Sequence, residues 1–168
     1  MFAEWGKYWH LEKPVLLEKS PPNLIRTRFL QELFPNSYFL IVTRHPIAVA
    51  YATQKWSNSS LTDLIEHWLV CHETFEQDKP HIRRLLVLRY EDFVRRPQAY
   101  LEMVYSFVGL PNHLNRIVVR SDVNEKYLKK WREYRDVTFS GGRIEAARIR
   151  LQYESRVATF GYSLDSFA

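Results

Sequence analysis

The chain has 168 residues, of which 46% are hydrophobic and 26% charged, a balance typical of one globular domain. Its formal net charge of +5 suits an anionic ligand, an acidic substrate or nucleic acid. A single cysteine, Cys71, excludes an internal disulfide and fits a reducing compartment, so we expect a cytoplasmic protein. No run approaches the roughly 20 apolar residues of a membrane helix, and the first residues lack the apolar core of a signal peptide.

The first third of the chain predicts two strands with a helix between them. A short apolar run at 14–17 predicts the first strand, and the run at 38–42 predicts the second. A helix is expected over 23–34, because its apolar residues recur with helical spacing and Pro35 follows it. The inward face of that helix would be Leu24, Ile25, Phe29 and Leu33.

The remainder of the chain predicts further helices and one more strand. Pro46 suits the first position of a helix, and Ser60 with Asp63 resembles a capping box that opens a helix over 61–78. The run "LLVLRY" at 85–90 predicts a buried strand. Further helices are expected from Pro97 to about Gly109 and across 113–160, the latter interrupted at Gly141-Gly142.

Strands that alternate with helices of ten or more residues predict an α/β fold with a parallel sheet covered on both faces. Only three strands are predicted, at about 15–18, 38–43 and 85–90. Three is few for such a sheet. Either edge strands escape the pattern, or the chain lacks part of its domain.

Polar clusters follow each predicted strand. They are Glu18-Lys19-Ser20, Thr43-Arg44-His45 and Arg89-Tyr90-Glu91-Asp92. Because ligands of open parallel sheets bind at the carboxyl ends of the strands, these clusters predict a site for a phosphate or sulfate group. Other interpretations stay open from the residues alone: Arg44 paired with Glu91 or at the surface, Lys19 solvated, and Tyr90 a core aromatic.

Several stretches resemble the sulfotransferase family, in particular its bacterial and protein-tyrosine or glycan branch. The first is "LLEKSPPNLIRTRFLQELFPNSYFLIVTRHPIAVA", at 16–50. The resemblance continues in "RYEDFVRRPQAYLEMVYSFVGL", "VNEKYLKKW" and "YESRVATFGYSL" and covers nearly the whole chain. The order of the Arg-x-Pro unit and the later Tyr-Glu-Asp unit is more specific than either unit alone.

The resemblance implies one sulfotransferase-like domain over 1–168, with a three-layer fold like that of P-loop NTPases. It implies an enzyme that transfers a sulfuryl group from 3′-phosphoadenylyl sulfate (PAPS) to a hydroxyl or amine and leaves PAP. Lys19 matches the lysine that approaches the sulfuryl group, where it would neutralise charge on the leaving oxygen. Arg44 matches the arginine that grips the 3′-phosphate, and Tyr90 matches a tyrosine that holds the nucleotide.

The chain departs from the family in two places. The family serine that also binds the 3′-phosphate is replaced by Ala52, and Thr53 or Lys55 would have to compensate. The family's first strand and Gly-rich loop have no counterpart before Lys19, and neither does its catalytic base. We therefore expect the C-terminal portion of a sulfotransferase, begun at an internal methionine. The alternative is a catalytically inactive fragment or a nucleotide-binding remnant.

The remaining motifs are weaker. "TFSGGR" at 138–143 is a candidate nucleotide loop through Arg143, although a plain turn between helices fits equally well. The basic, aromatic stretch 126–135 indicates an amphipathic helix rather than a nucleic-acid surface. His67 and His72 do not have the usual spacing of same-face metal ligands, so no metal is expected. A kinase or NTPase would need a Gly-x-x-x-x-Gly-Lys motif, which is absent, and the acceptor (protein tyrosine, glycan or small alcohol) stays open.

Overall fold

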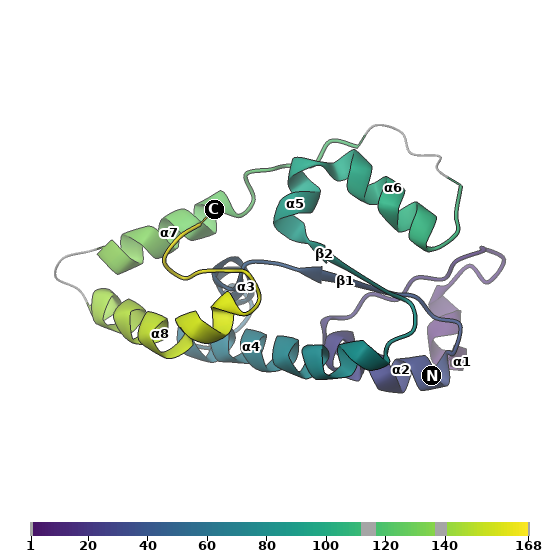
Figure 1. Ribbon diagram of the computed structural model, residues 1–168, viewed down its shortest axis with the longest axis horizontal. Coiled ribbons are helices and arrows are strands. Elements are labelled where there is room, and N and C mark those ends of the chain that lie inside the picture. Colours follow the sequence, from purple (N-terminus) through teal and green to yellow (C-terminus); the bar gives the residue numbers. More distant parts are fainter. Residues whose placement is uncertain (1, 112–116, 137–140, 168) are drawn as a thin grey trace.

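A computed structural model describes residues 2–111, 117–136 and 141–167. Two parallel strands, β1 (Phe39–Thr43) and β2 (Leu85–Arg89), pair in register from Phe39 opposite Leu85 to Thr43 opposite Arg89. In Figure 1 the long helix α4 runs below the strands, and α5 and α6 stand above them. The predicted α/β fold with a parallel sheet is confirmed, although the sheet is small.

The predicted strand at 14–17 is wrong. The segment 14–20 has no regular structure, so the described part of the chain has two strands instead of three. Val15 and Leu17 are exposed, and the indole nitrogen of Trp9 donates to the carbonyl of Leu17 at 2.9 Å. A strand needs a neighbouring strand to pair with, and an apolar run cannot reveal whether one is present.

Short helices make up the rest of the N-terminal region. They are α1 (Phe2–Trp5), η1 (Gly6–Tyr8), η2 (Pro21–Arg26) and α2 (Thr27–Leu33). Trp5 stacks on Phe34 with a ring-centroid distance of 5.6 Å, and Trp9 meets the edge of Trp5 at 5.7 Å. This aromatic cluster fastens the first helix to the end of α2.

The helix predicted over 23–34 exists, but its predicted inward face is wrong. None of the four predicted residues is buried: Ile25, Phe29 and Leu33 are exposed, and Leu24 is half-buried. Thr27, Leu30 and Gln31 are buried instead. The helix begins as a 3-10 turn with about three residues per turn, which moves the buried face away from the one that α-helical spacing predicts.

The next helices follow the sequence closely. The helix α3 (Pro46–Thr53) begins at a proline, as expected. The helix α4 (Leu61–Asp78) opens with the predicted capping box: Ser60 Oγ accepts from the backbone N–H of Asp63 at 3.1 Å, and the Asp63 carboxylate accepts from the backbone N–H of Ser60 at 3.3 Å. A short turn, η3 (Lys79–His81), leads to β2.

After β2 the described part of the chain has four more helices. They are α5 (Tyr90–Arg95), α6 (Pro97–Phe107), α7 (Glu125–Asp136) and α8 (Gly141–Ala158). Gly109 follows α6 with a φ of +72°, the left-handed conformation that glycine adopts most easily at a helix end. Among the described residues, no helix is long and apolar enough to cross a membrane.

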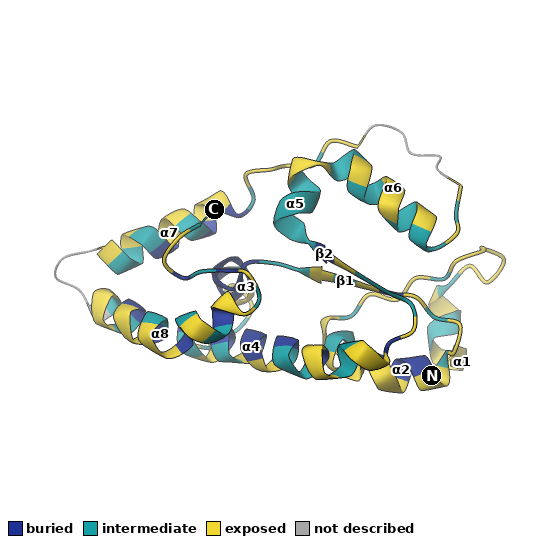
Figure 2. Cartoon of the chain, viewed as in Figure 1, coloured by how far each residue is buried: buried dark blue, intermediate teal, exposed yellow. Residues whose placement is uncertain are grey.

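The main core lies between helices rather than on the strands. Figure 2 shows buried positions on α3, α4 and α8. Trp131 of α7 is fully buried, and its indole nitrogen donates to the carbonyl of Leu164 at 2.9 Å. The core is built from α3, α4, α7, α8 and the segment after α8, and it fixes the helices behind the carboxyl ends of the strands.

Candidate anion site at the carboxyl ends of the strands

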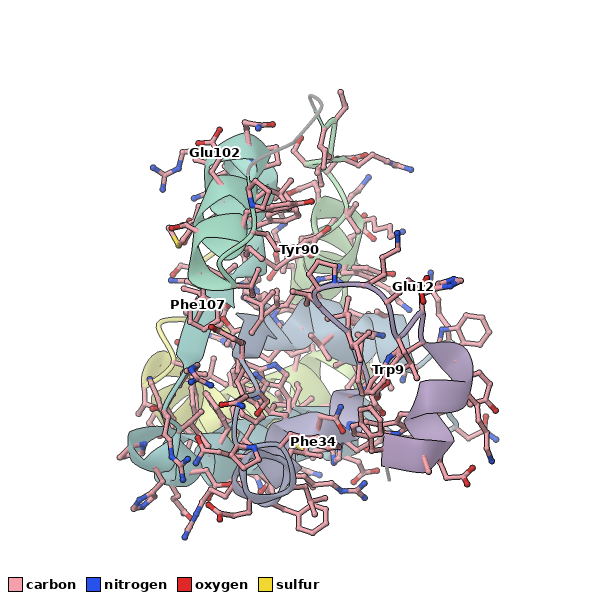
Figure 3. All side chains as sticks on the ribbon, turned by 90° about the vertical axis from the view of Figure 1, so that its right-hand side faces the viewer. Trp9, Glu12, Phe34, Tyr90, Glu102 and Phe107 are labelled. Atoms are coloured by element: carbon pink, nitrogen blue, oxygen red, sulfur yellow. The ribbon has the colours of Figure 1, made fainter. Side chains whose placement is uncertain are left out.

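The parallel register brings Arg44 and Tyr90 together. Thr43 and Arg89 are paired at the last position of β1 and β2, so the next residue of each strand lies at the same edge of the sheet. The Arg44 guanidinium carbon lies 4.7 Å from the centroid of the Tyr90 ring, close enough for a cation–π contact. In Figure 3, Tyr90 lies apart from Trp9 and Phe34 of the N-terminal aromatic cluster.

Arg44 is held from two sides and keeps one donor free. Its Nε donates to Oδ1 of Asn124 at 2.7 Å, and its backbone carbonyl accepts from the Trp68 indole at 3.2 Å. One terminal nitrogen of the guanidinium is buried and has no hydrogen-bond partner within the described chain. Since a buried polar group without a partner is costly, this nitrogen indicates a place for an acceptor supplied by a ligand.

Glu91 is linked to Arg44 only through Asn124. Its Oε1 accepts from Asn124 Nδ2 at 2.7 Å and from the backbone N–H of His45 at 3.0 Å. Its Oε2 accepts from the Tyr162 hydroxyl at 3.1 Å. Asn124 therefore stands between Arg44 and Glu91, and the two charged groups form no direct ion pair. The positive charge of Arg44 stays available to a ligand.

His45 caps α3 in its neutral form. Its Nδ1 accepts from the backbone N–H of Ile47 at 3.2 Å, so Nε2 carries the hydrogen and donates to the carbonyl of Ser163 at 3.1 Å. Burial lowers the pKa of His45, which outweighs the raising effect of the Ser163 carbonyl and the Glu91 carboxylate. The residue after Arg44 is thus a rigid cap rather than a second cation.

Three cations surround the ring of Tyr127, at the start of α7. The ring centroid lies 5.8 Å from the Arg44 guanidinium carbon, 5.5 Å from Lys55 Nζ and 4.9 Å from Lys126 Nζ. Burial acts to raise the pKa of the Tyr127 hydroxyl, but Lys55, Lys126 and Arg44 together lower it below its ordinary value. Positive potential is therefore concentrated at this point of the surface.

The other predicted site residues lie elsewhere. Lys19 is exposed, and within the described ranges no hydrogen bond, ion pair or cation–π contact joins it to Arg44 or Tyr90. Arg143 is exposed in the first turn of α8 and helps to lower the pKa of Asp136 at the far end of α7. That end is about 16 Å from the start of the helix. Residues 138–140 of the predicted nucleotide loop lie outside the described residues.

Other predicted features can also be placed. Ala52 packs partly buried against the helical core. His72 is buried, stacks on Trp68 with a centroid distance of 3.8 Å, and bonds to that residue's carbonyl at 2.7 Å. His67 faces Cys71 instead, with Nε2 3.6 Å from the sulfur. Among the residues described here, no group of three or more His, Cys, Asp or Glu side chains could hold a metal ion.

Sequence reasoning missed three residues of the site. Asn124 and Tyr127 lie in the stretch "VNEKYLKKW", whose pattern predicts only an amphipathic helix with inward aromatics. The structure confirms that packing, because Tyr127 and Trp131 are buried. Tyr162, near the end of the chain, reaches back to Glu91. No local signal marks these residues, since each acts on a partner far away in the sequence.

Comparison with known families and proteins gives one result. A family model described as "Sulfotransferase family" matches residues 2–114, which is more than half of the chain. No curated protein matches the sequence. The match includes Arg44 and Tyr90 at the strand ends, whereas Asn124, Tyr127 and Tyr162 lie beyond it.

Proposed function

Since the chain belongs to the sulfotransferase family, we propose that it acts in the transfer of a sulfuryl group from PAPS to a hydroxyl or amine acceptor, with release of PAP. The observation that carries the proposal is the geometry of Arg44. Its guanidinium stands at the carboxyl end of β1, against the Tyr90 ring, with a buried terminal nitrogen that lacks a partner. A phosphate oxygen is the acceptor that such a nitrogen binds best.

The residues present fit the two ends of the donor. Arg44 would hold the 3′-phosphate, and Tyr90 would hold the nucleotide beside it. Lys19 would stand at the sulfuryl end, where its ammonium group neutralises charge on the leaving phosphate oxygen. Because the 3′-phosphate and the 5′-phosphosulfate sit on different ribose carbons, Lys19 and Arg44 need not touch one another. The bound donor supplies the activated sulfuryl group, and no metal is required.

The proposal leaves the acceptor open among protein tyrosine, glycan and small alcohol. We also propose that the protein acts in the cytoplasm. Arg143 stays a proposed nucleotide contact, although it lies by the far end of α7 from Arg44. The Gly-rich loop of a P-loop-type fold would be needed to wrap the 5′-phosphosulfate. That loop has no counterpart in the sequence before Lys19.

A second candidate is a nucleotide-binding remnant without transfer activity. It is favoured by the exposure of Lys19, which contacts neither Arg44 nor Tyr90 in the described structure. Ala52 adds to this interpretation, because its methyl group packs on the core and offers no hydrogen bond. Both candidates predict PAP binding, and only the first predicts a sulfated product.

Calorimetric titration with PAP tests the phosphate site. We expect micromolar binding by the wild type and a loss of about 2–5 kcal/mol in Arg44→Ala, the range for truncating one member of a desolvated charge pair. Arg83→Ala is the matched control, since Arg83 is an exposed arginine whose contact is Glu32. Equal PAP affinity in the wild type and in Arg44→Ala would remove the basis of the proposal.

Product analysis with PAPS then separates the two candidates. The wild type is incubated with PAPS and a phenol, a glycan or an aliphatic alcohol, and sulfated product is measured. An enzyme should give product with at least one class, and Lys19→Ala should lose turnover while it keeps PAP affinity. PAP binding without product from any class would favour the remnant.

A further inference from the structure

The three cations at Tyr127 differ from the other basic residues nearby. On α7 and α8 most arginines have carboxylate partners: Arg132 pairs with Glu125, Arg135 with Asp136, and Arg156 with Glu66 and Glu73. Within the described ranges, no such ion pair includes Arg44, Lys55 or Lys126. Three positive charges without an ion-pair partner in these ranges thus converge on one phenol, and the Glu91 carboxylate, which shares Asn124 with Arg44, is already occupied by its own donors. Asp122 lies near enough to Lys126 to feel its charge.

The packing of α3 against α7 brings these residues together. Arg44 precedes α3, Lys55 lies just after its end, and Tyr127 is in the first turn of α7, which packs against α3. Lys55 is exposed and can reorient, whereas Arg44 is held by Asn124 at 2.7 Å. Lys126 also lines a hollow of about 390 Å³, whose charged lining is mixed: Arg120 and Lys129 on one hand, Asp122 and Glu125 on the other. Arg44 and Lys55 do not line that hollow. Lys55 and Arg44 therefore lie against the same Tyr127 ring, one on an exposed, flexible stem and the other held in place.

We propose that Lys55 is a binding residue for the phosphate monoester of the nucleotide, and that it acts with Arg44 and the Tyr127 hydroxyl in place of the hydroxyl contact that Ala52 cannot make. This inference rests on the proposed function, because it assigns a further residue to the same anion site. An ammonium group on a flexible stem suits the role, since it can follow a tetrahedral dianion without a fixed geometry. Lys55 would therefore set the preference for nucleotides that carry a 3′-phosphate.

The test compares two probes that differ in that phosphate alone. PAP carries phosphates at the 3′ and 5′ positions, and AMP carries only the 5′-phosphate. Binding of each is measured by calorimetry for the wild type, Lys55→Ala, Lys55→Arg and the control Lys79→Ala, whose exposed lysine pairs with Glu76 at the other end of α4. Urea unfolding of each variant verifies that the fold is retained.

We expect Lys55→Ala to weaken PAP binding by about tenfold or more, the effect of one hydrogen bond to a charged group, while AMP binding changes less than about twofold. Lys55→Arg should recover most of the PAP affinity, and Lys79→Ala should match the wild type. Tyr127→Phe tests the hydroxyl separately and should give a smaller loss, because both cations remain. A role for Lys55 in folding alone would lower the stability of Lys55→Ala and weaken both probes equally.

The outcomes distinguish this inference from the function on which it rests. PAP binding that is lost in Arg44→Ala but unchanged in Lys55→Ala overturns the role of Lys55 and leaves the proposed function standing. Equal losses of PAP and AMP affinity in Lys55→Ala also overturn it, since the 3′-phosphate would then not be the group recognised. No PAP binding by the folded wild type overturns both.

Discussion

Asn124→Ala tests how Arg44 is positioned. The Asn124 side chain is 9% exposed and joins two charged groups: it accepts from Arg44 Nε and donates to Glu91 Oε1, both at 2.7 Å. Alanine removes both hydrogen bonds and leaves a half-buried guanidinium and a half-buried carboxylate each short of one partner. Each bond to a charged group contributes about 1.5–3 kcal/mol. Because Arg44 and Glu91 are only half-buried and water can replace part of each bond, we take the lower end for both, about 3 kcal/mol in total.

Urea unfolding and thermal unfolding measure this loss. For a chain of this size a change of 1 kcal/mol shifts the melting temperature by about 2–4 °C, so Asn124→Ala should melt about 6–12 °C below the wild type. Asn58→Ala is the control, because Asn58 is exposed in the loop before α4. A loss in Asn124→Ala no larger than in the control, within about 0.5 kcal/mol, would show that Asn124 does not hold Arg44.

Three further changes test the surrounding structure. Ser60→Ala removes the cap of α4 and should lower the free energy of unfolding, measured in urea, by about 1 kcal/mol. Tyr162→Phe removes a hydrogen bond to the Glu91 carboxylate and should cost about 1.5–3 kcal/mol in the same assay; no change would mean that the C-terminal segment is not fastened to the site. Burial lowers the pKa of His45 below its usual 6.5, so between that lowered pKa and 6.5 the unfolded chain binds more protons, and stability rises with pH. Between about pH 7.5 and 5.5 the wild type should therefore lose more stability than His45→Asn, whose asparagine can still cap the helix; equal losses would contradict this.

Local patterns predicted the elements whose causes are local. The run at 38–42 forms β1 because its residues favour a strand and a strand partner is present. The helix α4 begins at Ser60 because the capping box needs only Ser60 and Asp63. Gly109 follows α6 with the positive φ that its position suggested. In each case the residues that decide the structure are neighbours in the sequence.

Patterns failed where distant contacts decide. The face of α2 that is buried includes Gln31, whose amide donates to the carbonyl of His81 at 3.0 Å and accepts from the backbone N–H of Arg83 at 2.7 Å. Thr27 is buried beside Asp78 at the end of α4. Polar residues therefore occupy the inner face because they bond to groups some 50 residues away, backbone groups for Gln31 and the Asp78 carboxylate for Thr27. Apolar spacing cannot reveal such a face.

The candidate site also contains some residues that the sequence predicted and others that only distant contacts explain. Arg44 and Tyr90 were predicted together because parallel strands bring their carboxyl ends to one edge, and the structure places them in contact. Asn124, just before α7, and Tyr127, in its first turn, lie some 80 residues beyond Arg44, and only tertiary packing brings them there. The role of Lys19 stays a prediction, because it depends on a donor that would bridge the distance to Arg44.

The most direct test of the account is a crystal structure of the protein with PAP. We expect the 3′-phosphate to lie against the terminal nitrogen of Arg44 that lacks a partner, beside the Tyr127 ring, with Asn124 still bonded to Arg44 Nε. PAP bound with its 3′-phosphate away from Arg44, and that nitrogen left unpaired, would contradict the central claim that this strand end is a phosphate site.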